Sequence, residues 1–199
     1  MTGAETRSGS LVIADAGVAR IRRRVRADAI DEFRWRKDPE LARYDAATPV
    51  PSTFSHFLAA FEFDLEFGRA GRETFALDSP EGTHIGSIMY YNADGESAEL
   101  GISIADPAYR GRGVGRAVIV AFLRWLWNSR PVRRLQLHTL AWNERAQRSF
   151  RAAGFEDAAR VSRNGQWFVR MEARREWWLL WDGEGRFEAR REEPESESA

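Results

Sequence analysis

Apolar side chains recur at the spacing of an α-helix in the middle of the chain, directly after a glycine-rich run. The positions that follow this spacing, at i, i+3, i+4, i+7, i+8 and i+11, are Val114, Ala117, Val118, Ala121, Phe122 and Trp125. This period predicts an amphipathic helix that ends near residues 128–131. The preceding apolar segment, residues 100–105, is broken by Asp106 and Pro107 and reads as the end of a strand. The glycines therefore lie where a strand passes into a helix.

The same reasoning predicts the other elements. Alternation bounded by turn residues predicts strands at residues 11–13, 18–25, 74–77, 84–91, 98–105, 134–141, 156–163 and 166–174. Helical spacing predicts helices at residues 27–37, at residues 143–153, and from an N-cap at Ser52 or Thr53 to about Phe67. Residues 61–67 also fit strand alternation, but the length of the segment favours a helix. Asn164 and Gly165 predict a hairpin turn between the last two strands.

The end of the chain carries Trp177, Trp178 and Trp181, followed by a glycine-containing turn and a charged segment. This pattern predicts an extra Trp-rich hairpin at residues 176–190. Packing against the domain's own sheet is the favoured cover for the tryptophans, and a homodimer contact is the alternative. Small and polar residues predict a flexible N-terminus at residues 1–10 and a disordered tail at residues 191–199. Residues 11–175 then form one domain.

Composition narrows the class of protein. A chain of 199 residues with 43% hydrophobic residues is long enough for one well-packed domain. It has no run of 18 apolar residues and no signal-peptide pattern, so we expect a soluble, cytoplasmic protein that does not contact a membrane. The absence of cysteine excludes disulfides and thiolate chemistry, and no metal-ligand spacing is present. Equal numbers of basic and acidic residues, 30 each, give no reason to expect a nucleic-acid partner.

The glycine run at residues 110–116 has the features of a phosphate-binding loop. Glycine permits unusual backbone angles and close approach of a ligand, and the N-terminus of a helix attracts anions. No acidic residue lies between Pro107 and Asn143, whereas seven arginines do: Arg110, Arg112, Arg116, Arg124, Arg130, Arg133 and Arg134. The loop matches neither a Walker motif nor a dinucleotide fingerprint. A solvated basic helix with a glycine-rich entry remains the alternative at this point.

Two motifs together resemble the signatures of the GNAT superfamily of acyl-CoA-dependent N-acyltransferases. Residues 110–115 read Arg-x-x-Gly-x-Gly, and residues 143–155 read Asn-x-x-Ala-x-x-x-Phe-x-x-x-Gly-Phe. The similarity extends over residues 18–174, and residues 35–40 resemble the branch of the ribosomal-protein N-terminal acetyltransferases. The resemblance implies an α+β fold, a three-layer α/β/α sandwich. Its mixed, mostly antiparallel sheet would contain one splayed pair of parallel strands.

The resemblance also implies a site for acetyl-CoA as co-substrate, without a metal. The pantetheine arm would lie between the splayed strands and bond the main chain of Ser103, Ile104 and Ala105. Backbone N–H groups of the glycine run would hold the pyrophosphate, and the residues concerned are Arg110, Gly111, Arg112, Gly113, Val114, Gly115 and Arg116. Asn143 and Phe150 would line the arm near the sulfur.

Acyl transfer to an amine needs a group that removes a proton from the ammonium. Glu99 lies where several relatives keep a carboxylate base, and His138 lies where others place a basic carboxylate and titrates near neutrality. The alternatives are an ordinary exposed strand glutamate and a hydrogen-bonded core histidine. Many relatives protonate the leaving thiolate with a tyrosine at position 150, but phenylalanine cannot donate a proton. Ser149, water or the more remote Tyr109 would have to serve.

The leading hypothesis is therefore an N-acetyltransferase that acts on a primary amine, either a protein N-terminus or a small molecule. Residues 28–66 contain nine acidic residues, which suit a cationic acceptor but also fit a solvated helix face. Because of Phe150, the alternative is a catalytically silent CoA-binding domain with a regulatory or interaction role. A nucleic-acid binder that uses the seven arginines is the remaining hypothesis.

Overall fold

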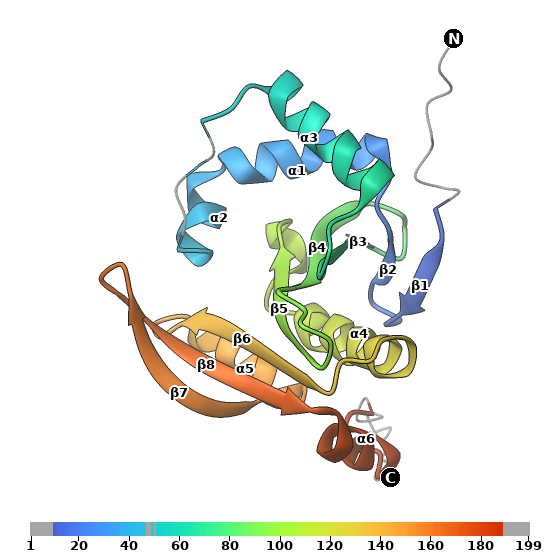
Figure 1. Cartoon of the computed structure of the whole chain (residues 1–199), viewed down its shortest axis with the longest axis vertical. Coiled ribbons are helices and arrows are strands. Elements are labelled where there is room, and N and C mark those ends of the chain that lie inside the picture. Colours follow the sequence, from blue (N-terminus) through green and yellow to red (C-terminus); the bar gives the residue numbers. More distant parts are fainter. Residues whose placement is uncertain (1–9, 47–48, 50, 189–199) are drawn as a thin grey trace, which may run out of the picture.

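The computed structural model describes residues 10–46, 49 and 51–188, which form one eight-stranded sheet flanked by helices (Figure 1). The strands are β1 (Val12–Asp15), β2 (Arg20–Arg23), β3 (Glu73–Asp78), β4 (His84–Tyr91), β5 (Ser97–Ile104), β6 (Arg134–Leu140), β7 (Glu156–Arg163) and β8 (Gln166–Arg174). They lie in the order β1-β2-β3-β4-β5-β6-β8-β7, and only β5 and β6 run parallel. The predicted mixed, mostly antiparallel α+β architecture is confirmed. The predicted flexible N-terminus and tail lie outside the described residues, apart from Ser10.

The helices lie on both faces of the sheet, with α4 and α5 on one face and α1, α2 and α3 gathered over the other (Figure 1). Their bounds are α1 (Ala29–Lys37), α2 (Pro39–Tyr44), α3 (Phe54–Phe67), α4 (Val114–Ser129), α5 (Glu144–Ala152) and α6 (Arg175–Gly183), with short 3-10 turns η2 (Arg26–Asp28) and η3 (Pro107–Tyr109). The segment before Phe67 is a helix, as its length predicts, and the Thr53 hydroxyl caps it by accepting from the His56 N–H at 3.4 Å.

The main hydrophobic core lies between α4 and the sheet. On α4, Val118 and Phe122 are fully buried, as the helical spacing predicts. They meet Phe75, Ile88 and Leu137 of the sheet within one cluster. Each such side chain stabilises the fold by about 1.5–3 kcal/mol when it leaves water. This packing fixes α4, and with it the glycine run at its N-terminus.

A buried ion-pair network joins the start of α1 to the sheet, on the face that lies opposite α4. Arg22 of β2 donates to Asp28 through Nη1 at 2.7 Å and to Asp78 of β3 through Nε at 2.6 Å. The Arg22 and Asp28 side chains are almost completely buried. Removing either Arg22 or Asp28 would leave a buried charge without its partner, which costs about 3–5 kcal/mol. The network therefore holds α1 in a defined position above the sheet.

The parallel strands β5 and β6 separate along their length. They pair only at three positions, Ser97 with Arg134, Ala98 with Leu135 and Glu99 with Gln136. Beyond Glu99, β5 continues to pair with β4 as far as Ile104, and β6 continues to pair with β8 as far as Leu140. The two strands are thus held on their outer sides while the space between them opens. The predicted splayed pair is confirmed.

The predicted C-terminal hairpin is wrong, because the Trp-rich segment forms the helix α6. Trp178 is fully buried, its ring stacks on Phe187 with centroids 4.7 Å apart, and its Nε1 donates to the Ala153 carbonyl at 2.8 Å. A Cβ at Gly154 would lie 2.7 Å from both aromatic side chains, so glycine is required there. The domain's own core covers Trp178, whereas Trp177 and Leu180 are exposed.

Candidate functional site

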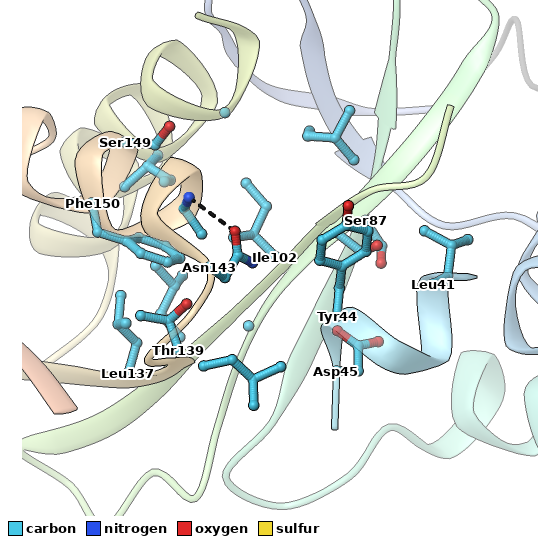
Figure 2. A pocket seen from close by; sticks show the side chains of 18 of the residues that line it. Leu41, Tyr44, Asp45, Ser87, Ile102, Leu137, Thr139, Asn143, Ser149 and Phe150 are labelled. Atoms are coloured by element: carbon cyan, nitrogen blue, oxygen red, sulfur yellow. Dashed lines mark hydrogen bonds between the residues drawn. The ribbon is translucent and has the colours of Figure 1, made fainter. Parts of the chain in front are cut away.

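The separation of β5 and β6 opens into a cleft of about 920 Å³. Figure 2 shows that its walls come from both halves of the molecule, with Tyr44 and Asp45 at the end of α2 on one side and Asn143, Ser149 and Phe150 of the α5 region on the other. Of the residues predicted from the sequence, Ser103, Ile104, Arg110, Gly111, Gly113, Gly115, His138, Asn143 and Phe150 line the cleft. Glu99, Ala105, Arg112, Val114 and Arg116 lie outside its lining.

The glycine run forms an open cradle at the N-terminus of α4. Gly111 and Gly113 adopt left-handed φ values of 76° and 77°, and Gly113 is the N-cap residue. A Cβ added at Gly111, Gly113 or Gly115 would meet nothing within 4 Å. Within the described part of the chain, no side chain caps this helix. Its first N–H groups thus have no side-chain partner, and the space beside the glycines is open, which suits an anion.

Two arginines of the loop are engaged by the protein itself. Arg110 donates to the Ile104 carbonyl at 2.9 Å and the Ala105 carbonyl at 2.6 Å, and it pairs with Glu40 at 2.9 Å. Arg116 donates to the Ala152 and Phe187 carbonyls. Their guanidinium groups tie neighbouring segments together, so the cradle is made mainly of backbone.

The remaining loop and strand residues divide between core, solvent and cleft. Val114 is buried in the core beneath α4, and Arg112 is exposed. Ala105 is buried, and its N–H donates to the Ile85 carbonyl at 2.8 Å. Both main-chain groups of Ala105 thus have partners, and the Ile104 carbonyl is taken by Arg110. Ser103 and Ile104 line the cleft, whereas Ala105 does not.

On the α5 side, Asn143 and Phe150 face the cleft as Figure 2 shows. The Asn143 Oδ1 accepts from the Ala146 N–H at 3.2 Å, which caps α5. Phe150 packs edge-on against Phe155, with ring centroids 6.0 Å apart. Ser149, the residue before Phe150, carries a hydroxyl and also lines the cleft.

The structure brings the two predicted proton acceptors together. His138 Nδ1 lies 3.3 Å from Glu99 Oε2, at the end of the paired part of β5 and β6. Tyr91 donates to the same Glu99 oxygen at 3.3 Å, and Asn92 donates to the other at 3.0 Å. The Glu99 carboxylate is therefore fixed by three neighbours and in turn orients the imidazole.

The other imidazole nitrogen is also occupied. Arg163, the last residue of β7, approaches His138 Nε2 at 3.1 Å. Burial lowers the pKa of His138, and the Arg163 charge lowers it further, while Glu99 opposes the change. The imidazole is thus neutral near pH 7 and able to accept a proton once Arg163 moves away.

Most carboxylates of residues 28–66 are paired inside the protein, so they do not form a free acidic wall. Besides Asp28, the pairs are Asp31 with Arg34, Glu32 with Arg24, Glu40 with Arg110, Glu62 with Arg26 and Asp64 with Arg69. Asp38 caps α2. Asp45 is not in such an ion pair with any residue that the structure describes. It lines the cleft, and its side chain is in contact with solvent although many protein atoms lie around it. Burial raises the pKa of Asp45, and the Arg36 charge opposes this.

Sequence reasoning missed the wall opposite the glycine loop. Ser87, Met89 and Tyr91 alternate along β4 and face the cleft, together with Tyr44 and Arg72. The alternation on β4 is a visible signal, since every second residue of a half-buried strand shares a face. The position of Arg72 depends on pairing between distant strands and has no local signal.

The splayed parallel pair, with a glycine cradle at a helix N-terminus beside it, defines an acyltransferase of the GNAT class. The family model described as "Acetyltransferase (GNAT) domain" matches residues 20–156, and the chain belongs to this family. No curated protein matches the chain. Among the described residues there is no group of three or more His, Cys, Asp or Glu side chains that could hold a metal ion, nor a helix long and apolar enough to cross a membrane.

Solved structures with the same fold include two kinds of amine acetyltransferase. The spermidine N-acetyltransferase from Vibrio cholerae, in complex with CoA and spermine, is 18% identical with a TM-score of 0.72; the match covers 81% of this chain and 98% of that one. The aminoglycoside acetyltransferase AAC(6')-Ib, in complex with ribostamycin and coenzyme A, is 18% identical with a TM-score of 0.69; the match covers 81% and 96%. At this identity the similarity establishes the fold.

Proposed function

We propose that the protein transfers the acetyl group of acetyl-CoA to a primary amine, on a protein N-terminus or a small molecule. The observation that carries the proposal is the open gap between β5 and β6, which ends at an unobstructed backbone cradle. Membership of the acetyltransferase family and a fold shared with CoA-bound N-acetyltransferases support it.

The residues of the cleft fit a thioester of coenzyme A. The cradle at Gly111–Gly115 offers backbone N–H groups and a helix N-terminus to a pyrophosphate, and glycine leaves room for close approach. The unpaired edges of β5 and β6 offer main-chain groups to an amide-bearing arm. Bound acetyl-CoA would supply the activated acetyl group. The chain's own contribution is to hold the amine nitrogen of the acceptor beside the thioester carbon, in an orientation from which it can attack.

Proton removal from the acceptor is proposed for the Glu99–His138 pair, directly or through water. His138 faces the cleft, and Glu99 lies behind it and orients its Nδ1. We assign the base to His138 Nε2, after displacement of Arg163. Because Phe150 cannot protonate the leaving thiolate, we assign that step to the Ser149 hydroxyl or to water at the same wall.

The test is release of free CoA from acetyl-CoA in the presence of a panel of primary amines, with a thiol reagent as readout. We expect release above background with at least one amine, and a loss of about 100-fold or more in His138→Ala, the usual contribution of a positioned base. No release from any amine contradicts the proposal. A rate that is unchanged in both His138→Ala and Glu99→Gln contradicts the assignment of the base.

A catalytically silent CoA-binding domain is the second candidate, and Phe150 is the observation that favours it. It predicts binding of CoA by calorimetry with no release of CoA from acetyl-CoA in the same preparation. The CoA-release assay on the wild type separates the two, because a competent site releases CoA with at least one amine, whereas a silent domain binds CoA and releases none. Phe150→Tyr tests the cause: release that appears only in this variant assigns the silence to Phe150.

Three finer assignments belong to this proposal. The similarity of residues 35–40 to the ribosomal-protein branch favours a protein N-terminus among the acceptors, and the sequence favours the cytoplasm. A homodimer through the C-terminal segment would now use the exposed Trp177 and Leu180 of α6. Sedimentation of the wild type and of Leu180→Glu tests it: a monomer in both contradicts the dimer.

A further inference from the structure

Arg72, just before β3, places a partly buried guanidinium in the wall of the cleft without a carboxylate to balance it. Its Nε donates to Thr74 Oγ1 at 3.4 Å, and its Nη2 approaches Met89 Sδ at 3.3 Å. Both are weak, neutral acceptors. Across the described residues, no carboxylate lies within ion-pair distance of Arg72. A half-buried cation normally has such a partner, because losing water without one is costly.

The surroundings increase the positive charge at this wall. Burial lowers the pKa of Arg72, and the charges of Arg69, Arg24 and Arg36 lower it further, while the more remote Asp64 opposes the change. Arg69 has its own partner in Asp64 at 2.6 Å. Asp45 is close enough to Arg36 for the two charges to interact, and Arg24 and Arg36 share Glu32.

That sharing is loose. Glu32 Oε2 lies 3.5 Å from Arg24 and 3.9 Å from Arg36, both longer than a well-formed charged hydrogen bond. Among the described residues that line the cleft there are five arginines, Arg36, Arg72, Arg110, Arg145 and Arg148, and two carboxylates, Glu32 and Asp45. Of these arginines, Arg110 and Arg148 pair with Glu40 and Glu144 outside the lining. We call the part of the cleft formed by Arg72 and Arg36 the Arg72 wall. A polycationic amine would be repelled there, whereas an anion would be attracted.

The Arg72 wall lies within reach of the reacting centre proposed above. Met89 of β4, which contacts Arg72, is directly opposite Gly101 of β5. Its Cγ lies 3.1 Å from where a Gly101 Cβ would be, so the Met89 side chain covers that glycine. Gly101 belongs to the part of β5 that no longer pairs with β6. From the β5–β6 gap to the guanidinium is about two strand spacings, or roughly 10 Å.

From this geometry we infer that the acceptor carries an oxyanion, a carboxylate or a phosphate, several bonds from its amine, and that Arg72 with Arg36 binds it. The guanidinium fork matches the planar geometry of a carboxylate and also suits phosphate oxygens. The inference rests on the proposed acetyltransferase function for the identity of the amine end. The oxyanion site itself is independent of catalysis and is testable without it.

Calorimetry of the full chain with glutarate, in the absence of any CoA compound, tests the oxyanion site. We expect saturable binding that weakens as salt is raised, and a loss of about tenfold or more in affinity in Arg72→Gln, since a charge-assisted bidentate contact is removed. Arg134→Gln, an exposed arginine outside the cleft, is the matched control and should bind glutarate as the wild type does. Thermal unfolding of each variant verifies that it is folded. If Arg72→Gln does not fold, Arg36→Gln, whose side chain is about half exposed, takes its place with a smaller expected loss.

The amine end is tested by CoA release with matched acceptors. We expect 4-aminobutanoate to have a much higher kcat/KM than butylamine, with the difference abolished in Arg72→Gln. A dipeptide pair, Ala-Asp amide and Ala-Asn amide, tells a peptide source of the oxyanion from a free amino acid, and a preference for 2-aminoethyl phosphate identifies phosphate.

The outcomes separate the two proposals. Glutarate binding that is absent, or that is equal in the wild type and Arg72→Gln, overturns the oxyanion site whatever the transferase assay gives. Equal use of butylamine and the anionic amines overturns the assigned acceptor class. Arg72-dependent glutarate binding with no CoA release from any amine leaves the oxyanion site established and removes the transferase proposal.

Discussion

Replacing Trp178 with alanine tests whether the last helix is an integral part of the domain. The indole is fully buried, stacks on Phe187 and donates to the Ala153 carbonyl at 2.8 Å. Truncating a buried tryptophan to alanine costs about 3–5 kcal/mol. Loss of the donor to Ala153 adds to this, but water entering the new cavity would offset part of it, so we expect about 4–5 kcal/mol.

That loss is large beside a total stability of about 5–15 kcal/mol, and it corresponds to a fall in Tm of roughly 8–20 °C for a domain of this size. Urea unfolding followed by circular dichroism measures the change in the free energy of unfolding. The neighbouring Trp177→Ala is a matched control, because Trp177 is 57% exposed and should change stability by no more than about 0.5 kcal/mol. The packing described for α6 is refuted if the two variants are equally stable.

Three further predictions concern the site and its support. Arg163→Gln should raise the pKa of His138, because a neighbouring positive charge is removed; the acid limb of the kcat/KM profile then moves to higher pH, and no movement would exclude His138 as the base. Gly113→Ala should raise the KM for acetyl-CoA about tenfold, through strain at φ 77° and obstruction of one backbone contact. Gly165→Ala, at φ 75° in a hairpin turn away from the cradle, carries similar strain and should leave that KM unchanged. Burial lowers the pKa of His84, so the unfolded chain binds its proton more readily; stability should fall as pH drops below about 6.5, and His84→Phe should flatten that slope in urea titrations. An unchanged slope would contradict a neutral, buried His84.

The elements with strong local signals were predicted closely. The hairpin of β7 and β8 has the predicted bounds, because Asn164 and Gly165, both at positive φ, set the turn and hence the register. The amphipathic period located α4 and the side that it buries. The glycine run was placed correctly at the helix N-terminus, since both flanking elements carry their own period.

What the sequence could not supply depends on contacts between distant segments. The run of tryptophans suggested strands because aromatic residues favour them, but α6 forms because Trp178 fills the space above Gly154. The acidic segment suggested a wall for a cation, but carboxylates in it are taken by arginines distant in the sequence: Glu62 by Arg26, 36 residues away, and Glu40 by Arg110, 70 residues away. Arg72 enters the cleft only through the pairing of β3 with β4.

Arg116 has a consequence for the dimensions of the cleft. From the first turn of α4 it donates both to Ala152, at the end of α5, and to Phe187, beyond α6. The helix α5, which is capped by Asn143 and carries Phe150, is therefore held at a fixed separation from the glycine cradle by Arg116, whose side chain does not line the cleft. The distance between the two ends of a long ligand would thus be set from outside the cleft, by the turn that follows α6, so that ending the chain before Phe187 would weaken the binding of both ends together.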